Sequence, residues 1–138
     1  MKVISLVVFG NPMGKQRARI LKSGISFTPD KTVNYETLVK LTYGQLEDKC
    51  FFNGQVWVRI TAYYPISKST SKLKSKQMVD GFIRPTKKPD CDNVAKIICD
   101  ALNGVAYRDD SQIVTCVIKK YYGEVPKVII EIGEYEGG

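Results

Sequence analysis

The chain of 138 residues contains no histidine. Ser-His-Asp and Cys-His catalytic arrangements, histidine general bases and histidine-rich metal sites are therefore excluded. The four cysteines show no Cys-x-x-Cys spacing, so a zinc ribbon is not expected either. Any demanding proton or charge transfer in this protein must then rely on lysine or on a bound metal ion.

Long apolar runs and a secretory signal are also missing. The first residues, 1–9, form a short apolar stretch without a cleavage site, which is typical of a strand. No stretch approaches the length needed to cross a bilayer, so we expect no membrane partner. Free cysteines without a secretory signal indicate a reducing compartment, and we expect a cytoplasmic protein.

Charge of one sign dominates the chain. Lysine and arginine number 21 against 14 acidic residues, which gives a formal net charge of +7 at pH 7. Residues 67–89 concentrate this excess and are expected to form a basic, mobile loop, which could contain a short helix at 72–79. Such a loop is usually just solvated, but in a basic chain it favours a polyanionic partner.

Hydrophobic periodicity predicts a single domain over residues 1–138, of α/β (α+β) class, with a mixed sheet of about five strands and two main helices. Residues 2–9 resemble a strand buried on both faces, and 19–27 a hairpin. Thr28 and Pro29 are expected to open a helix that runs to about residue 48, with Tyr35, Leu38 and Val39 facing inward. Residues 55–66, 112–122 and 127–132 are predicted strands, and apolar residues alternate along the first of them, with Val56, Val58, Ile60, Ala62 and Tyr64 on one face. Residues 92–103 are the predicted second helix, with its inward stripe formed by Val94, Ile97, Ile98, Ala101 and Leu102.

Residues 88–112 place five aspartates in this basic chain. Asp90 and Asp92 lie just before and at the start of the second helix, and Asp109 and Asp110 follow its end. Because a short loop leads the chain back across the sheet, acids from both segments could converge on one cation. Mg²⁺ prefers a few carboxylate oxygens together with water and substrate phosphate. The sequence therefore predicts metal-assisted chemistry on a phosphate backbone.

Lys96 could take part in the same reaction. Asp92, Lys96 and Asp100 follow one another at intervals of four, so they share one face of the predicted helix. There Lys96 could donate to the phosphoryl oxygens or orient the attacking water. The three residues could instead form an exposed salt-bridge ladder worth roughly a few tenths of a kcal/mol per pair. Asp92 or Asn93 could simply cap the helix, and the later acidic pair could belong to an ordinary turn.

These motifs resemble the RusA family of Holliday junction resolvases, which are common in phages and prophages. The resemblance lies in Asp90-x-Asp92-Asn93-x-x-Lys96, followed by Asp109-Asp110-x-Gln112. Upstream, Gly10-Asn-Pro-x-x-Lys15-x-Arg17-x-Arg19 is similar to the family's N-terminal hairpin, and Arg84-Pro-x-x-Lys-Lys-Pro-Asp90 to its approach to the first acid. Cys91 departs from the pattern, since an aliphatic residue is usual there. The similarity extends from about Val3 to Ile132.

The resemblance implies a homodimeric endonuclease that cuts four-way DNA junctions by paired symmetric nicks with Mg²⁺, for which Mn²⁺ can substitute. A two-fold dimer suits a substrate of two-fold symmetry. The implied catalytic residues are Asp90, Asp92, Lys96 and Asp110, and the implied metal ligands are the same three aspartates with Asp109 as an additional candidate. Two alternatives stay open: a nuclease for other branched DNA such as flaps or forks, and a non-catalytic nucleic-acid-binding module.

Basic side chains are the candidates for DNA contact. Lys15, Arg17 and Arg19 alternate, so on a strand they would share a face and could bind successive phosphates. The alternative is a hairpin edge that is kept positive to discourage aggregation. Tyr107 could stack on bases beside Arg108, or be buried where the helix closes. The full candidate set is Lys15, Arg17, Arg19, Lys72, Lys74, Lys76, Arg84, Lys87, Lys88 and Arg108. With DNA bound, the protein would be associated with the nucleoid.

Overall fold

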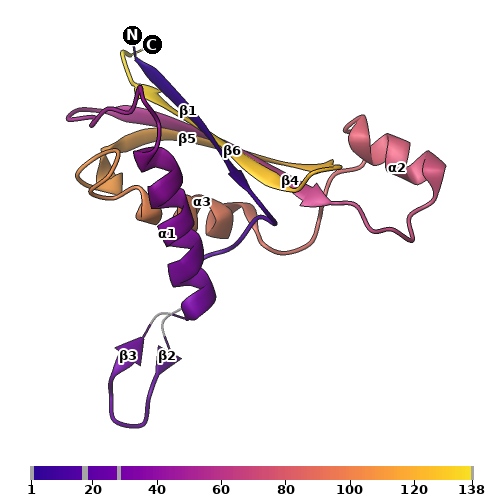
Figure 1. The fold of residues 1–138 in the computed structure, drawn as a ribbon, viewed down its shortest axis with the longest axis horizontal. Helices are drawn as coiled ribbons and strands as arrows, with labels where there is room; N and C mark the ends of the chain where they lie inside the picture. Colours follow the sequence, from indigo (N-terminus) through magenta and orange to yellow (C-terminus); the bar gives the residue numbers. More distant parts are fainter. Residues whose placement is uncertain (1, 17–18, 28, 138) are drawn as a thin grey trace.

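A computed structural model describes residues 2–16, 19–27 and 29–137, with the backbone alone at positions 19 and 27. It shows a single α+β domain, which confirms the predicted class (Figure 1). No helix within these ranges is long and apolar enough to span a membrane. The elements in chain order are β1 (Val3–Phe9), β2 (Arg19–Ile20), β3 (Ser26–Phe27), α1 (Asp30–Gly44), β4 (Val56–Pro65), α2 (Lys72–Val79), α3 (Cys91–Ala101), the 3₁₀ turn η1 (Asp110–Gln112), β5 (Ile113–Gly123) and β6 (Lys127–Glu134).

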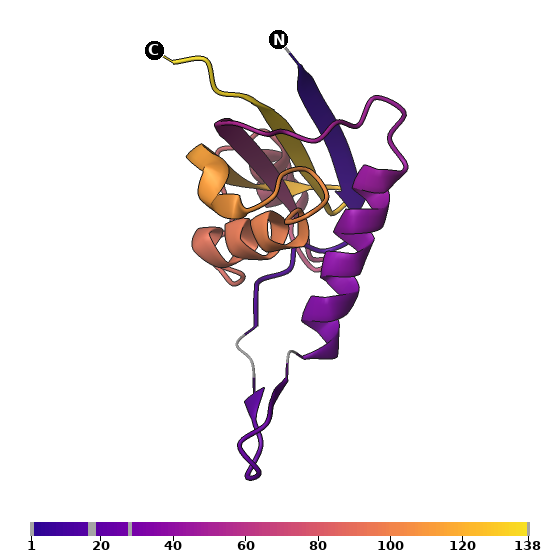
Figure 2. The same cartoon turned by 90° about the vertical axis from the view of Figure 1, so that its left-hand side faces the viewer.

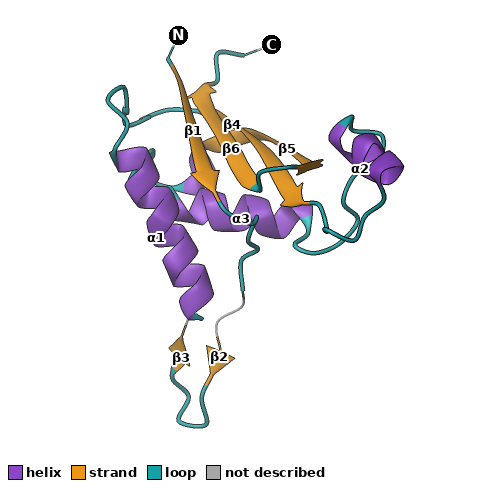
Figure 3. Cartoon of the chain, turned by 45° about the vertical axis from the view of Figure 1, so that its right-hand side comes forward, coloured by secondary structure: helices purple, strands orange, loops and turns teal. Residues whose placement is uncertain are grey.

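The main sheet is mixed, as expected, and has four strands in the order β1–β6–β4–β5. β6 runs antiparallel to both of its neighbours, whereas β4 and β5 are parallel. The sheet is one strand smaller than expected because β2 and β3 pair with each other in a separate hairpin. Figure 3 shows this hairpin beyond the N-terminal end of α1, away from the sheet.

One face of the sheet carries the core. The alternation predicted for residues 55–66 is confirmed, because every second residue of β4 from Val56 to Tyr64 is buried. Figure 2 shows α1 and α3 together on one side of the sheet. The expectation that the first strand is buried on both faces is wrong. Ile4, Leu6 and Val8 are buried, but Val3 and Phe9 are 43% and 66% exposed, since β1 is an edge strand with one packed face.

Helix α1 begins one residue later than predicted, with Pro29 at the N-cap, and ends at Gly44 rather than near residue 48. The predicted capping residue, Thr28, lies outside the described residues. Tyr35 and Val39 are buried as expected, but Leu38 is exposed, because the inward stripe continues through Thr32 and Tyr43 instead. This rotation brings the neighbouring polar face of α1 towards α3.

Helix α3 follows the prediction closely. Its apolar stripe, Val94, Ile97, Ile98, Ala101 and Leu102, is fully buried. The Val, Ile and Leu side chains of this stripe each contribute about 1.5–3 kcal/mol when they are fully buried. With that face buried, the opposite face of α3 carries its charged residues, of which Asp92 and Lys96 are exposed and Asp100 is half-buried.

The basic segment 67–89 contains the short helix α2, in agreement with the helix considered at 72–79. Ser71 caps α2 by accepting a hydrogen bond from the Lys74 amide. The end of the segment is attached to β5: Arg84 Nε donates to the Lys120 carbonyl at 2.8 Å, and Lys120 Nζ donates to the Lys87 carbonyl at 2.7 Å. The mobility of this segment stays a prediction.

Candidate active site

The charged face of α3 links two clusters of polar side chains. Asp90 is the N-cap residue of α3, Asp92 lies in the first turn, and Lys96 and Asp100 follow at intervals of one turn. At a rise of about 1.5 Å per residue, Asp92 and Asp100 lie about 12 Å apart along the helix axis. The first cluster therefore lies at the N-terminal end of α3 and the second near its C-terminal end.

The N-terminal cluster consists of Asp90 and Asp92, both exposed. Asp90 occupies the capping position but its side chain makes no capping hydrogen bond. Among the described residues neither carboxylate takes part in an ion pair. Asp90 lines an open groove of about 470 Å³, whose other walls are residues 12–16, Lys88, Pro89 and Asn93. The alternative in which Asp92 or Asn93 caps the helix is not realised, because Asp90 holds the N-cap position. The Asp90 side chain itself stays available to a cation.

Core packing fixes the chain just before Asp90. The Tyr64 hydroxyl of β4 donates a hydrogen bond to the Pro89 carbonyl. Burial, with smaller contributions from Cys91 and Asp90, raises the pKa of Tyr64 to about 12, so the hydroxyl keeps its proton as a donor. The start of α3 is therefore tied to the C-terminal end of β4.

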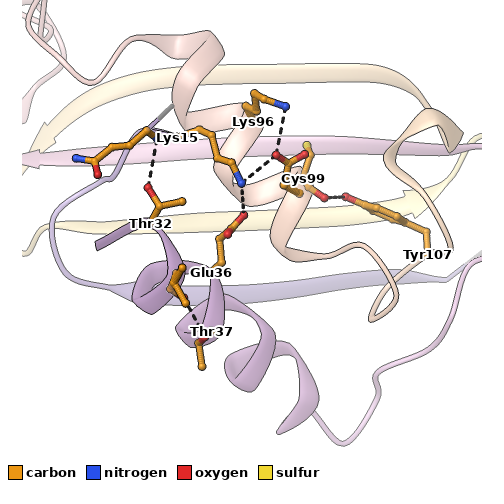
Figure 4. A network of polar contacts seen from close by, with 10 residues as sticks. Lys15, Thr32, Glu36, Thr37, Lys96, Cys99 and Tyr107 are labelled. Carbon is orange, nitrogen blue, oxygen red and sulfur yellow. Dashed lines mark hydrogen bonds and ion pairs between the residues drawn. The ribbon is translucent and has the colours of Figure 1, made fainter. Parts of the chain in front are cut away.

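The second cluster is a chain of alternating charges from α1 to α3 (Figure 4). Lys15 Nζ lies 2.8 Å from Glu36 Oε2 on α1 and 3.3 Å from Asp100 Oδ2 on α3. Lys96 Nζ lies 3.2 Å from the same oxygen of Asp100. Of the Asp92–Lys96–Asp100 ladder considered from the sequence, the Lys96–Asp100 pair is thus formed. Asp100 also pairs with Lys15 from a distant segment.

Asp110 joins this second cluster. Burial and the neighbouring carboxyl of Asp100 raise the pKa of Asp110 above its usual value. Lys96 opposes the shift, which places its ammonium near the same carboxyl. Lys96, Asp100 and Asp110 therefore share one local environment.

A capping box shapes the turn that carries the acidic pair. The Asp109 side chain accepts a hydrogen bond from the Ser111 amide at 3.0 Å. The Ser111 side chain and this amide together lower the pKa of Asp109. The Gln112 side chain accepts from the amides of Arg108 and Asp109 and donates to the carbonyls of Phe52 and Gly54. Gln112 thereby ties the Asp109–Asp110 turn to the segment before β4.

The chemistry of the donors fits a hard cation, because Asp90 and Asp92 offer carboxylate oxygens with no competing cation in the described chain. However, no group of three or more His, Cys, Asp or Glu side chains lies close enough together in that part of the chain to hold a metal ion. Asp110 lies beside Asp100, at the far end of α3 from Asp90 and Asp92. The convergence of Asp90, Asp92 and Asp110 on one cation stays a prediction.

The candidate DNA-binding residues fall in three places. Lys72, Lys74, Lys76, Lys87 and Lys88 are exposed on α2 and the segment that follows it, and Arg108 is exposed before the acidic turn. Arg84 is exposed as well, with its guanidinium carbon 4.1 Å from the centre of the Tyr121 ring. Lys15 is not on a strand, and its ammonium is held by carboxylates. Arg17 and the side chain of Arg19 lie outside the described residues.

Tyr107 belongs to the core. It is fully buried, and its hydroxyl donates to the Cys99 carbonyl at 2.6 Å, so the structure realises the buried alternative and not base stacking. Sequence reasoning missed two site residues. Glu36 was not among the candidate site residues, and Asp100 was expected only in a possible salt-bridge ladder. No local pattern marks Glu36, because its partner Lys15 is 21 residues away.

Comparison with known proteins identifies the family of the chain. The family model described as "Endodeoxyribonuclease RusA" matches residues 10–133. The chain is also 35% identical, over 139 residues, to a protein of Bacillus subtilis (strain 168) named "Uncharacterized protein YqaN". That similarity covers 97% of this chain and 98% of the relative. The chain therefore belongs to the RusA endodeoxyribonuclease family.

Proposed function

We propose that this protein is a Mg²⁺-dependent endonuclease that resolves four-way DNA junctions by paired symmetric nicks, in DNA recombination and repair. Membership of the RusA family supports DNA as the substrate and phosphodiester hydrolysis as the reaction. The observation that carries the proposal is the pair of exposed carboxylates, Asp90 and Asp92, that no described cation neutralises. In a chain of net charge +7, such a pair suits a metal ion bound beside a DNA backbone.

The metal ion and Lys96 would carry out the reaction. Asp90, Asp92 and Asp110 would hold the ion, with Asp109 as an additional ligand and Mn²⁺ as a possible substitute for Mg²⁺. A bound Mg²⁺ supplies polarisation of the phosphoryl oxygen, an acidified water and neutralisation of the leaving oxyanion. Lys96, whose side chain is 61% exposed, would donate to the phosphoryl oxygens as negative charge develops on them, or orient the water.

DNA would be held mainly through its phosphates. Lysine and arginine that neutralise phosphates supply most of the sequence-independent affinity for DNA. The exposed basic residues near α2 and around both clusters suit this role. We assign DNA contact to Arg17, Arg19, Lys72, Lys74, Lys76, Arg84, Lys87, Lys88 and Arg108, and treat Lys15 separately below. A homodimer would present two such sites to a junction of two-fold symmetry, as paired nicks require. We expect the protein in the cytoplasm, associated with the nucleoid when bound to DNA.

The deciding experiment compares an immobile four-way junction with linear duplex of the same sequence, each with Mg²⁺ and with EDTA. Paired symmetric nicks in the junction, absent from the duplex and abolished by EDTA, are the expected result. Flap and fork substrates run in parallel test the alternative of a nuclease for other branches. Faster cleavage of those substrates would overturn junction specificity. Tight junction binding without cleavage in Mg²⁺ and in Mn²⁺ would overturn the enzymatic proposal in favour of a binding module.

A further inference from the structure

Residues 12–16, which follow β1, are clamped between α1 and α3. The Lys15 amide donates to the Asn93 carbonyl of α3 at 3.1 Å, and the Gln16 amide donates to Thr32 Oγ1 of α1 at 3.2 Å. Thr32 is fully buried. A Cβ added to Gly14 would lie only 3.0 Å from Pro89 Cβ and 3.2 Å from Asn93 Cβ. The backbone that carries Lys15 is therefore fixed against both helices.

The Lys15 side chain is fixed as firmly as its backbone. Its ammonium bridges Glu36 and Asp100, and the side chains of Lys15, Glu36 and Asp100 are only 22%, 17% and 19% exposed. Burial lowers the pKa of Lys15, but the two carboxylates outweigh this effect and the pKa lies above the usual value. Lys15 is consequently a permanent cation at neutral pH, and a phosphate could bind it only by competing with two carboxylates.

Asp100 connects the fixed ammonium of Lys15 with that of Lys96. One oxygen, Asp100 Oδ2, lies 3.3 Å from Lys15 Nζ and 3.2 Å from Lys96 Nζ. Lys96 itself is 61% exposed, and a free lysine side chain gives up about 1.5–2 kcal/mol of rotamer entropy when it is held in one conformation. If the Asp100 carboxylate were not held in one position, the Lys96 ammonium would sample many positions. Asp100 in turn has Asp110 as a like-charged neighbour, so it needs a cation to stay in place.

We propose that Lys15 is a positioning residue of the cleavage reaction: Lys15, clamped by Glu36, holds Asp100, and Asp100 directs the Lys96 ammonium towards the site of cleavage. This inference rests on the proposed function of Lys96. It differs from the expectation that Lys15 binds a DNA phosphate, and the two roles predict different kinetics. A phosphate contact stabilises the bound DNA, whereas a positioning contact changes the rate of the chemical step.

The test is single-turnover cleavage of a four-way junction at saturating protein, together with the dissociation constant in Ca²⁺ as a function of salt. Lys15→Met keeps an unbranched side chain that is one atom shorter and removes its charge. We expect a cleavage rate at least about tenfold lower, since small misplacements of reacting groups can cost up to about 10²-fold. The dissociation constant and its salt dependence should stay within about twofold of wild type, because no phosphate contact is lost. Lys31→Met, on the exposed face of α1, is the matched control and should leave both quantities unchanged.

Double substitution tests the connection between Lys15 and Asp100. If both act through Lys96, Lys15→Met combined with Asp100→Asn should be no slower than the slower single variant, whereas independent effects would multiply. Lys15→Arg should recover part of the rate, because it can still bridge two carboxylates. Glu36→Gln loosens Lys15 without removing it and provides the same test if Lys15→Met fails to fold in a thermal unfolding measurement.

Each outcome has a distinct meaning. A wild-type protein that cuts no branched DNA would overturn the proposed function and this inference with it. Wild-type cleavage with an unchanged rate in Lys15→Met would overturn the inference alone. A weaker dissociation constant, a salt slope reduced by about 0.9 and an unchanged rate at saturation would instead assign Lys15 to a phosphate.

Discussion

The carboxyl of Asp110 lies beside that of Asp100 across the turn that joins α3 to β5, and after burial this neighbour is the main cause of the raised pKa of Asp110. Two carboxyl groups so close together repel each other when both are ionised, and Lys96 offsets only part of this repulsion. This repulsion is unfavourable in the protein without ligands, and such clusters of titratable groups are typical of functional sites that bind a cation or a substrate. Stability and activity should therefore respond in opposite directions when one of these acids is neutralised.

Asp110→Asn should abolish cleavage and leave the fold intact. Loss of a ligand that helps to neutralise the transition state corresponds to several kcal/mol, so we expect the rate to fall by about a hundredfold or more. Junction binding should be retained or become tighter, since one negative charge beside the phosphates is gone. Because the folded state raises the pKa of Asp110, its ionised form destabilises the fold at neutral pH. The melting temperature of Asp110→Asn at pH 7 should therefore equal or exceed that of wild type.

The matched control is Asp48→Asn, an exposed acid in the loop after α1. It should cleave and bind like wild type. Weak junction binding by Asp110→Asn, or a melting temperature clearly below that of wild type, would contradict this interpretation of the Asp100–Asp110 contact.

The lysines of α2 should contribute to DNA binding through their charge alone. Replacing Lys72, Lys74 and Lys76 by glutamine keeps the helix but removes its three exposed positive charges. The slope of log K against log salt should decrease by about 0.9 for each phosphate contact that is lost. Binding to a labelled junction is measured between about 50 and 200 mM salt, because the affinity for DNA falls steeply over this range when several phosphates are contacted.

A triple variant with the same change in net charge serves as the control for α2. Lys31, Lys40 and Lys49 are exposed on α1 and the loop after it. Their replacement by glutamine should change the slope much less. Equal slopes for both triple variants would show that only the overall charge of the protein matters.

The cross-strand pair of Arg59 and Glu131 should make stability depend on pH in the acidic range. The two residues are direct partners in the β4–β6 ladder, and Arg59 Nε and Nη2 donate to the two oxygens of Glu131, each at 2.9 Å. The hydrogen bond with Arg59 lowers the pKa of Glu131 below its usual value. The stabilisation is therefore present above the unfolded pKa of 4.5 and is lost as pH falls through the lower folded value.

Glu131→Gln should accordingly reduce the free energy of unfolding by about 0.2–1 kcal/mol at pH 7, as for other solvent-exposed pairs. Urea unfolding at a series of pH values should show the difference from wild type shrinking below pH 4.5. Glu134→Gln, at the exposed end of β6, should show no such trend. A difference that stays constant with pH would rule out the ion pair as its cause.

Gly133 should resist substitution because Trp57 lies directly opposite it in the β4–β6 ladder. A Cβ at position 133 would lie 2.5 Å from Cζ2 of the indole, which no packed structure tolerates without movement. We expect Gly133→Ala to lower the free energy of unfolding by about 1–3 kcal/mol, the usual cost of overpacking. Gly44 lies at the end of α1, where an added Cβ would meet no atom of another element within 4 Å. Gly44→Ala should instead raise the free energy of unfolding by about 0.5–1 kcal/mol. Equal effects in urea unfolding would show that the indole simply moves aside.

Local patterns in the sequence determined the parts of this protein that depend on near neighbours. The buried stripe of α3 and the alternation of β4 follow from residue periods of 3.6 and 2, so both were predicted with their correct inward faces. The acids on either side of α3 and the basic excess in residues 67–89 were equally visible. They were sufficient for the resemblance to the RusA family, which the match over residues 10–133 confirmed.

Only the tertiary structure decided which distant side chains meet. Leu38 was expected inside, but the position of β1 and α3 selects a stripe through Thr32 and Tyr43, and this choice turns Glu36 towards Lys15. The contact of Lys15 with Asp100 spans 85 positions and has no periodic signature. The position of Lys15 depends on the close approach of Gly14 to α3 and on which face of α1 is buried in the core. Long-range packing of this kind is set by shape and charge in three dimensions, so a single sequence does not reveal it.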